Sequence, residues 1–185
     1  MNRKLELGLG ILLLAGIFFL AREGAAVVSS KEVTVEEVKT SENCIVIDAG
    51  HGGDDPGKVG INGVLEKDLN LQIALKVKEL LEQDGTTVVL TRESDAGLYD
   101  AGTPNKKVQD MRRRCEIITK AMPLFTVSIH QNSYPEEAIK GAQCFYFGQS
   151  EEGKKLAEAI QASLKAELDT ENHREAKANE SYYLL

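Results

Sequence analysis

The sequence predicts an α/β fold in which helices cover both faces of a mostly parallel sheet. The pattern of apolar residues along the chain supports this prediction. Short apolar runs rich in β-formers alternate along the chain with longer segments whose apolar residues recur at helical spacing, and this alternation is typical of βαβ units. The chain has 185 residues, 42% of them hydrophobic, which is enough to bury the core of a single domain.

The first segment of the chain, residues 1–26, is predicted to be a signal peptide or a membrane anchor. Arg3 and Lys4 precede the nearly continuous apolar stretch 7–21, which has about the length of the apolar region of a secretory signal and is short for a membrane span. Both alternatives place the rest of the chain outside the cytoplasmic membrane, either anchored or secreted. Residues 27–43, rich in Ser, Thr, Glu and Lys, are predicted to be a linker with a short strand in it.

From residue 44 onward the apolar pattern alternates between strands and helices. The predicted strands are 44–49, 86–91, 124–130 and 142–147. The predicted helices are 65–83, 108–121 and 151–168. In the first helix the spacing of the apolar side chains predicts one buried face, made of Leu69, Ile73, Val77 and Leu80.

Two histidines each follow a predicted strand: His51 ends the run IVIDAGH, and His130 ends the run FTVSIH. Open α/β sheets bind ligands at the carboxyl ends of their strands, so the two imidazoles are expected to converge. Glu66, at the start of the first helix, would complete a three-ligand site with an open position for water, as in hydrolytic zinc enzymes. The alternative is structural: a histidine after a strand is commonly a hydrogen-bonded turn residue, and an acidic residue in a first helical turn complements the helix dipole.

The loop between His51 and Glu66, GGDDPGKVGINGV, is rich in glycine. Composition alone favours a flexible surface loop. In a metal site the glycines would let the backbone approach an ion and turn back, so that Glu66 reaches His51. Asp48, shortly before this loop, is expected either to orient an imidazole or to fill a buried capping role.

Several segments, in order along the chain, resemble zinc-dependent N-acetylmuramoyl-L-alanine amidases of the amidase-3 type. These segments are IVIDAGHGGDDPGKVGINGVLEKDLNL, VVLTRESD, MRRRCEIITKA, FTVSIHQN and KGAQCFYF. Together they cover residues 44–185, and the greatest similarity is to the germination-specific amidases of spore-forming bacteria. The resemblance implies that 44–185 is a catalytic domain that hydrolyses the amide between N-acetylmuramic acid and L-alanine in peptidoglycan, during remodelling of the cell wall or spore cortex.

The same resemblance implies which residues bind the metal and which residues surround them. His51, Glu66 and His130 fall where the family keeps its Zn²⁺ ligands. Asp48, Arg92, Arg114 and Asn132 are implied to contact substrate or to support the ligands. For Arg92 an internal ion pair with Asp95 is the favoured alternative to substrate contact.

The family's general base is a glutamate in a late strand, within a motif resembling Val-Glu-x-Gly-Phe. This sequence contains no such motif up to Leu185, so the catalytic residue stays unassigned. The chain is therefore expected to lack the last strand and helix of the fold and to be inactive or weakly active. A non-catalytic, zinc-containing peptidoglycan-binding or regulatory domain remains the alternative, and a two-metal phosphoesterase would need more carboxylates than the strand ends offer.

The net charge narrows the possible binding partners of the chain. The net charge of −7 argues against binding nucleic acid, because such binding depends on neutralising phosphates. It does not argue against peptidoglycan. Membrane contact is expected only through the N-terminal segment if it is not cleaved, and a protein activator is left open.

The three cysteines form no CxxC pair and are expected to be small buried hydrophobes.

Overall fold

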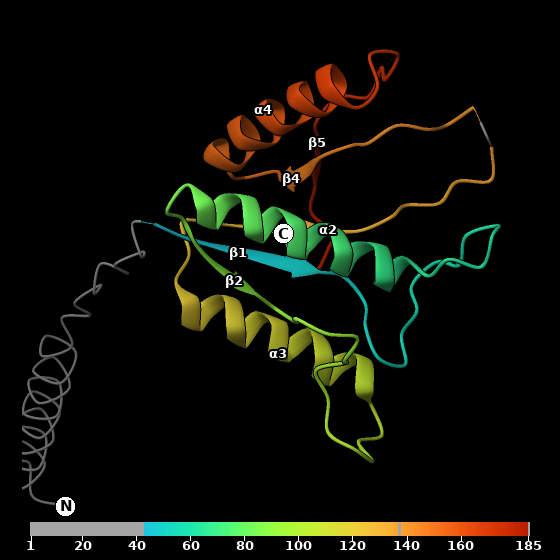
Figure 1. Cartoon of the computed structure of the whole chain (residues 1–185), viewed down its shortest axis with the longest axis vertical. Coiled ribbons are helices and arrows are strands. Elements are labelled where there is room, and N and C mark those ends of the chain that lie inside the picture. Colours follow the sequence, from blue (N-terminus) through green and yellow to red (C-terminus); the bar gives the residue numbers. More distant parts are fainter. Residues whose placement is uncertain (1–42, 137, 185) are drawn as a thin grey trace, which may run out of the picture. The chain divides into compact units, whose positions relative to one another are not determined.

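A three-stranded parallel sheet forms the centre of the fold in the computed structural model (Figure 1). The structure describes residues 43–136 and 138–184. The strands, in the spatial order β2-β1-β3, are β1 (Cys44–Ala49), β2 (Thr87–Leu90) and β3 (Phe125–Ile129). The signal or anchor predicted at 1–26, and the linker apart from its last residue, lie outside the described residues. No helix of the described part is long and apolar enough to span a bilayer.

Strand β1 is central because its side chains are suited to burial on both faces. All six of its residues are buried, as expected of the middle strand of a parallel sheet. Side chains alternate between the two faces of a strand. Ile45 and Ile47 belong to the apolar cluster that α2 packs against, while Asp48 points to the opposite face and pairs with Arg114 of α3.

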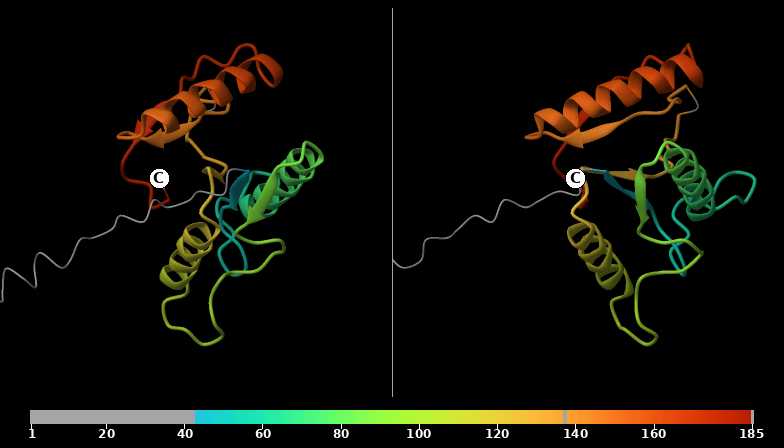
Figure 2. Two further views of the ribbon diagram at one scale, coloured as in Figure 1. Left: turned by 90° about the vertical axis from the view of Figure 1, so that its left-hand side faces the viewer. Right: turned by 60° about the vertical axis from the view of Figure 1, so that its left-hand side comes forward.

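Helices α2 (Glu66–Gln83) and α3 (Lys106–Ala121) cover opposite faces of this sheet (Figure 2). Connections between parallel strands are almost always right-handed. Because β2 and β3 lie on opposite sides of β1, the crossovers that lead to them place their helices on opposite faces. The predicted arrangement, a mostly parallel sheet with a helix on each face, is therefore confirmed.

The buried face of α2 differs from the predicted one. Leu69 and Leu80 are 38% and 63% exposed, whereas the fully buried positions include Asn70 and Ala74. The physical reason is hydrogen bonding: the polar side chains of Glu66 and Asn70 are buried because they form hydrogen bonds to the loops at the strand ends. This rotates the buried stripe away from the one that apolar spacing indicates.

The C-terminal part of the described chain contains a second, two-stranded sheet. Strands β4 (Phe145–Phe147) and β5 (Lys177–Asn179) pair in parallel and are joined by helix α4 (Glu151–Glu167), which packs on β4. The sequence predicted a longer strand at 142–147 and none near 177. Strand β5 has the sequence KAN, which carries neither the apolar alternation nor the β-branched residues that reveal a strand.

Candidate metal centre

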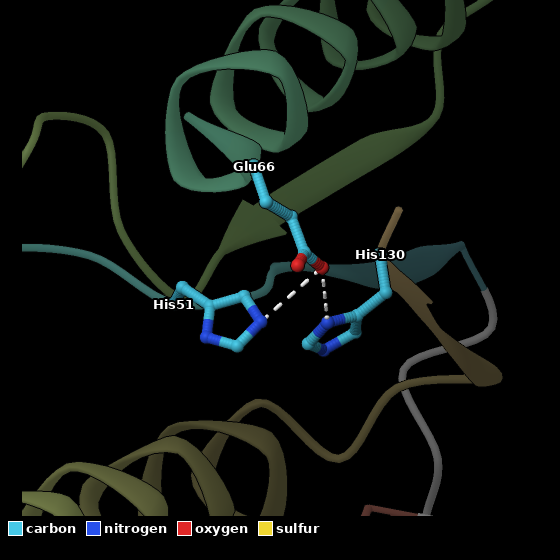
Figure 3. Close-up of side chains that lie close together, drawn as sticks. All are labelled: His51, Glu66 and His130. Carbon is cyan, nitrogen blue, oxygen red and sulfur yellow. Dashed lines mark hydrogen bonds and ion pairs between the residues drawn. The ribbon is translucent and has the colours of Figure 1, made fainter. Parts of the chain in front are cut away.

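The three side chains predicted as ligands lie together at the carboxyl end of the central sheet (Figure 3). One potential ligand atom from each of His51, Glu66 and His130 lies within 4.8 Å of the other two. Oε1 of Glu66 is 3.2 Å from Nε2 of His51 and 3.0 Å from Nδ1 of His130. The two imidazole rings meet edge to face, with their centroids 4.8 Å apart.

Pairing between β1 and β3 brings the two histidines side by side. Ala49 is opposite Ile129 in the register, and the Gly50 N–H donates to the Ile129 carbonyl at 3.1 Å. His51 and His130 follow directly from these paired ends. From β1 the chain runs first to β2 on one side and later to β3 on the other, so the histidines lie at the switch point where open α/β sheets bind ligands.

Gly50 permits the close approach of the second histidine. A Cβ atom at this position would lie 2.3 Å from Cε1 of His130, far inside van der Waals contact. Any side chain here would displace the His130 ring.

The loop after His51 folds back on itself and delivers Glu66 to the site. Its return is fixed by the Glu66 N–H, which donates to the Lys58 carbonyl at 2.9 Å. Gly57 adopts a left-handed conformation with φ +67°, and a Cβ there would lie 2.6 Å from Cδ2 of His51 and 2.7 Å from Oε2 of Glu66. Glycine satisfies both requirements, as expected of a loop that lets the backbone approach an ion and turn back.

Glu66 is held as an ionised acceptor. Its Oε2 accepts the Lys58 N–H at 2.8 Å and its Oε1 accepts the Gln131 N–H at 2.9 Å. Burial acts to raise the pKa of Glu66, but these backbone hydrogen bonds and His130 outweigh it, and the pKa is lowered. The carboxylate is therefore charged and fixed in place before any cation binds.

His51 is held at both its ring and its backbone. Nδ1 of the ring lies 2.9 Å from Oδ2 of Asp55, while the backbone takes the left-handed conformation with φ +64°, which is uncommon for a non-glycine residue. Arg114 Nη2 donates to the His51 carbonyl at 2.7 Å. Burial acts to raise the pKa of Asp55, but hydrogen bonds from His51 and from the Gly57 N–H outweigh it, so the pKa is lowered.

Asp48 does not orient an imidazole; it joins the sheet to α3. Oδ1 accepts from Thr91 Oγ1 and from Arg114 Nη1, both at 2.7 Å, and Oδ2 accepts from Ser128 Oγ at 2.6 Å. Burial acts to raise the pKa of Asp48, but Arg114 and the two hydroxyls outweigh it, so the pKa is lowered. Asp48 is buried, but it fills neither of the two expected roles, because it lies within β1 and accepts from side chains instead of capping the backbone.

Arg92 is buried and supports the same strand end from the other face. Its guanidinium donates to backbone carbonyl oxygens rather than to a carboxylate, and these acceptors belong to Ala49, Gly50, Lys67 and Ser94. The predicted ion pair with Asp95 is wrong, since Asp95 pairs with Lys67 at 2.7 Å. Arg92 and Arg114 are 4% and 1% exposed, so neither presents its guanidinium to a substrate. Asn132 is exposed, two residues after His130.

Three residues support the site in ways that were not predicted from the sequence: Asn70, Gln131 and Asp55. Asn70 is fully buried and donates to the Gly50 carbonyl at 3.2 Å, and its side-chain oxygen accepts from Gln131 Nε2 at 3.1 Å. Its position four residues after Glu66 puts both on one helical stripe, which is a signal the sequence did offer. Gln131 binds Glu66 through its backbone N–H, which no residue pattern reveals.

The three side chains suit a zinc ion. Two imidazole nitrogens and one carboxylate oxygen are the protein ligands of many catalytic zinc sites. The His130 side chain is 44% exposed, so one side of the group faces solvent and leaves room for a further ligand. In the described part of the chain, the carboxylates that contact the imidazoles are Glu66 and Asp55, and both are engaged in hydrogen bonds.

Comparison with known proteins identifies similar sequences. The family model described as N-acetylmuramoyl-L-alanine amidase matches residues 45–185. The germination-specific N-acetylmuramoyl-L-alanine amidase of Bacillus subtilis is 38% identical over 148 residues, which cover 78% of this chain and 62% of that protein. The N-acetylmuramoyl-L-alanine amidase LytC of Bacillus subtilis is 34% identical over 128 residues, covering 68% and 23%. The chain thus spans less than two thirds of the length of these curated relatives.

Two solved structures share the fold. The CwlD amidase from Clostridioides difficile, solved in complex with the GerS lipoprotein, superposes with a TM-score of 0.75 at 40% identity, covering 77% of this chain and 75% of that one. The catalytic domain of CwlV, an amidase from Bacillus (Paenibacillus) polymyxa var. colistinus, superposes with a TM-score of 0.59 at 28% identity, covering 77% and 72%.

Proposed function

The chain belongs to the N-acetylmuramoyl-L-alanine amidase family whose model matches residues 45–185, and from this membership we propose that it hydrolyses the amide between N-acetylmuramic acid and L-alanine in peptidoglycan. The observation that carries the proposal is the convergence of His51, Glu66 and His130 at the switch point of the sheet. The relatives' names point to cell-wall or spore-cortex remodelling, with germination the process named for the Bacillus subtilis relative.

The proposed cofactor is Zn²⁺, held by His51, Glu66 and His130. A zinc ion so held would supply Lewis acidity, which activates water and polarises a carbonyl near neutral pH. The chain's own residues prepare the site for it. Glu66 contributes a negative charge that two backbone N–H groups hold in place, and Asp55 and Arg114 fix His51.

The substrate would approach from the side of His130, which is the most exposed of the three residues. Asn132, exposed beside it, is the proposed contact with the peptide or sugar. Arg92 and Arg114 are proposed to act at a distance, because they bind the carbonyl groups of residues 49–51 and so set the position of His51.

The alternative function is a zinc-containing peptidoglycan-binding or regulatory domain that does not turn over. It is favoured by one observation: both described carboxylates at the imidazoles, Glu66 and Asp55, are already engaged. Neither is free to move a proton, and loss of a positioned acid or base lowers rates by about 10² to 10⁴. Under this alternative the chain would hydrolyse peptidoglycan slowly or not at all.

A combined binding and turnover assay tests the proposal. The purified chain should contain one zinc per molecule by elemental analysis, and His130→Ala should lose most of it. New L-alanine amino termini released from purified peptidoglycan would show amidase activity, and sedimentation with insoluble peptidoglycan would show binding. Stoichiometric zinc with binding but no release would favour the non-catalytic alternative. A chain that neither binds zinc nor peptidoglycan would contradict both.

Two further proposals concern location and partners. From the apolar stretch 7–21 we infer that the body of the protein is exported and either membrane-anchored or secreted to the wall. A reporter fused after Glu42 should be active outside the cytoplasmic membrane, and cytoplasmic activity would contradict export. Because the CwlD relative was solved with a lipoprotein, we also propose a protein partner, which co-elution of the chain with lipoproteins of its own organism would test.

A further inference from the structure

We propose that Asp55 is a positioning residue that selects the tautomer of His51 and so presents Nε2 of that ring to the metal. The inference rests on the proposed zinc site. It concerns how the chain prepares one ligand, and it is carried by the hydrogen bonds of the loop between His51 and Glu66.

The two ring nitrogens of His51 have different surroundings, and Figure 3 shows the contact of one of them with Glu66. Nε2 faces the Glu66 carboxylate at 3.2 Å, whereas Nδ1 lies 2.9 Å from Oδ2 of Asp55. A neutral imidazole carries one N–H and one lone pair. Both carboxylates only accept hydrogen bonds, but only the contact between Nδ1 and Asp55 has hydrogen-bond geometry, whereas Nε2 and Glu66 are close without forming a hydrogen bond. The geometry therefore places the proton of neutral His51 on Nδ1 and the lone pair on Nε2, where a cation would bind.

Asp55 is itself fixed so that it can fill this role. Its backbone exchanges two hydrogen bonds with Gly52, at 3.0 and 3.1 Å. Its other carboxylate oxygen, Oδ1, accepts the Gly57 N–H at 3.1 Å. Both oxygens therefore receive a hydrogen from a donor whose position is set by the loop.

The same arrangement makes an amide an unsuitable replacement. An asparagine at position 55 has one oxygen and one NH₂ group, yet it would face two donors, the Gly57 N–H and the His51 Nδ1–H. If the oxygen accepts from Gly57, the NH₂ group faces Nδ1 and can be accommodated only when that nitrogen carries the lone pair. The proton of His51 then moves to Nε2, where it blocks the metal.

His130 has no equivalent support. Its Nδ1 lies 3.0 Å from Glu66, and among the described residues its Nε2 has no hydrogen-bond partner. Its side chain is 44% exposed, against 20% for His51. Asp55 therefore supports the His51 imidazole on the side away from Glu66, and the His130 imidazole has no such partner among the described residues.

The test compares Asp55→Asn with Asp54→Asn, a matched control in the same loop. Asp54 forms an exposed ion pair with Lys106 and makes no contact with the imidazoles. With ¹⁵N-labelled histidine in the purified 185-residue chain, metal-free and at a pH where the imidazoles are neutral, NMR reports which nitrogen of each of the three histidines is protonated. Exposed His173 serves as the internal reference.

The expected result is a His51 Nδ1–H in the wild type and in Asp54→Asn, and an Nε2–H in Asp55→Asn. Competition with a zinc chelator should show zinc affinity lowered about 10- to 100-fold in Asp55→Asn only, the usual effect of removing a partner of a metal-binding histidine. In the Co²⁺-loaded proteins, the visible spectrum of Asp55→Asn should differ from the other two.

Three outcomes would overturn the inference. A wild-type His51 protonated on Nε2 would contradict it directly. Equal zinc affinity in the wild type and Asp55→Asn would contradict it while leaving the zinc proposal intact. A wild type that binds no zinc would instead remove the proposed function and this inference with it.

Discussion

At the scale of single residues, the site depends on close contacts at two glycines, where the backbone leaves no room for a Cβ atom. Glu66 Oε1 lies within 3.2 Å of a nitrogen from each histidine. Gly50 lies against the His130 ring, and Gly57 lies against both His51 and Glu66. Because Glu66 is also fixed by backbone hydrogen bonds, a small change at a non-ligand position should alter the geometry of the ligands.

The substitution Gly50→Ala should displace the His130 ring without replacing any of the three ligands. Its Cβ would lie 2.3 Å from Cε1 of that ring, so the ring must move. We expect a loss of about 1 to 3 kcal/mol in the free energy of unfolding, typical of overpacking, together with weaker zinc binding. Urea unfolding and chelator competition measure the two effects. Gly148→Ala, where the nearest atom is the flexible end of Glu180, should change neither; zinc affinity retained in Gly50→Ala would refute the steric argument.

At the scale of secondary-structure elements, a single buried carboxylate connects the sheet to α3. Asp48 of β1 accepts hydrogen bonds from Thr91 after β2, from Ser128 in β3 and from Arg114 in α3. Arg114 continues to Asp110 of its own helix at 2.6 Å. Removing one partner of such a buried pair leaves the other charge uncompensated, which is much more costly than losing an exposed pair.

Replacing Arg114 by Met should therefore lower the free energy of unfolding by about 3 to 5 kcal/mol, as measured by urea denaturation. The double variant Asp48→Asn/Arg114→Met should lose less than the sum of the two single variants, because their side chains are in contact. The control is Arg113→Met. Arg113 is the adjacent and more exposed arginine, so this substitution should change the free energy of unfolding little. Additive losses would show that the pair is not coupled.

The Asp48 carboxylate should also make the free energy of unfolding depend on pH. The pKa of Asp48 is lowered in the folded chain from its ordinary value of 3.8, so its contribution is present above that value and is lost as the pH falls through the lower, folded pKa. The free energy of unfolding should thus decline below about pH 4. Asp48→Asn, measured by urea denaturation over the same range, should decline less steeply. Parallel pH profiles for the two proteins would contradict the assignment.

The elements that the sequence predicted well are those whose burial is apolar. The run IVI of β1 and the alternation of strand and helix around it led to the central sheet, and the histidines after β1 and β3 led to the site. Polar burial was harder to predict. Asn70 occupies a core position because of hydrogen bonds that form only in the folded chain. Likewise, the acceptors of Arg92 are carbonyl oxygens, which every residue has and which therefore leave no mark in the sequence.

At the scale of the whole molecule, the site joins two strands of the central sheet to the helix α2 that covers one of its faces. His51 follows β1, Glu66 begins α2 and His130 follows β3. A cation bound by all three residues would hold the start of α2 to the ends of β1 and β3. Any ligand that binds only the folded state stabilises it in proportion to the logarithm of its concentration over its dissociation constant.

Metal removal should therefore lower thermal stability. With free zinc at about 100 times its dissociation constant, the stabilisation is about 2.7 kcal/mol. Differential scanning calorimetry of the zinc-loaded chain, with and without a chelator, should show a lower Tm after chelation. His130→Ala should have a Tm that chelator hardly changes. An unchanged Tm in the wild type would indicate that zinc does not bind this group of residues.

The distance along the chain between these residues sets the order of events during folding. Glu66 and His130 are 64 positions apart in sequence, and the chain between them forms the rest of α2, then β2, α3 and β3. Closing so long an interval costs conformational entropy that local segments do not pay, and non-local contacts form slowly. The ability to take up a metal should thus appear only when β3 adds to the edge of β1, which makes the metal a reporter of the latest step in assembling the central sheet.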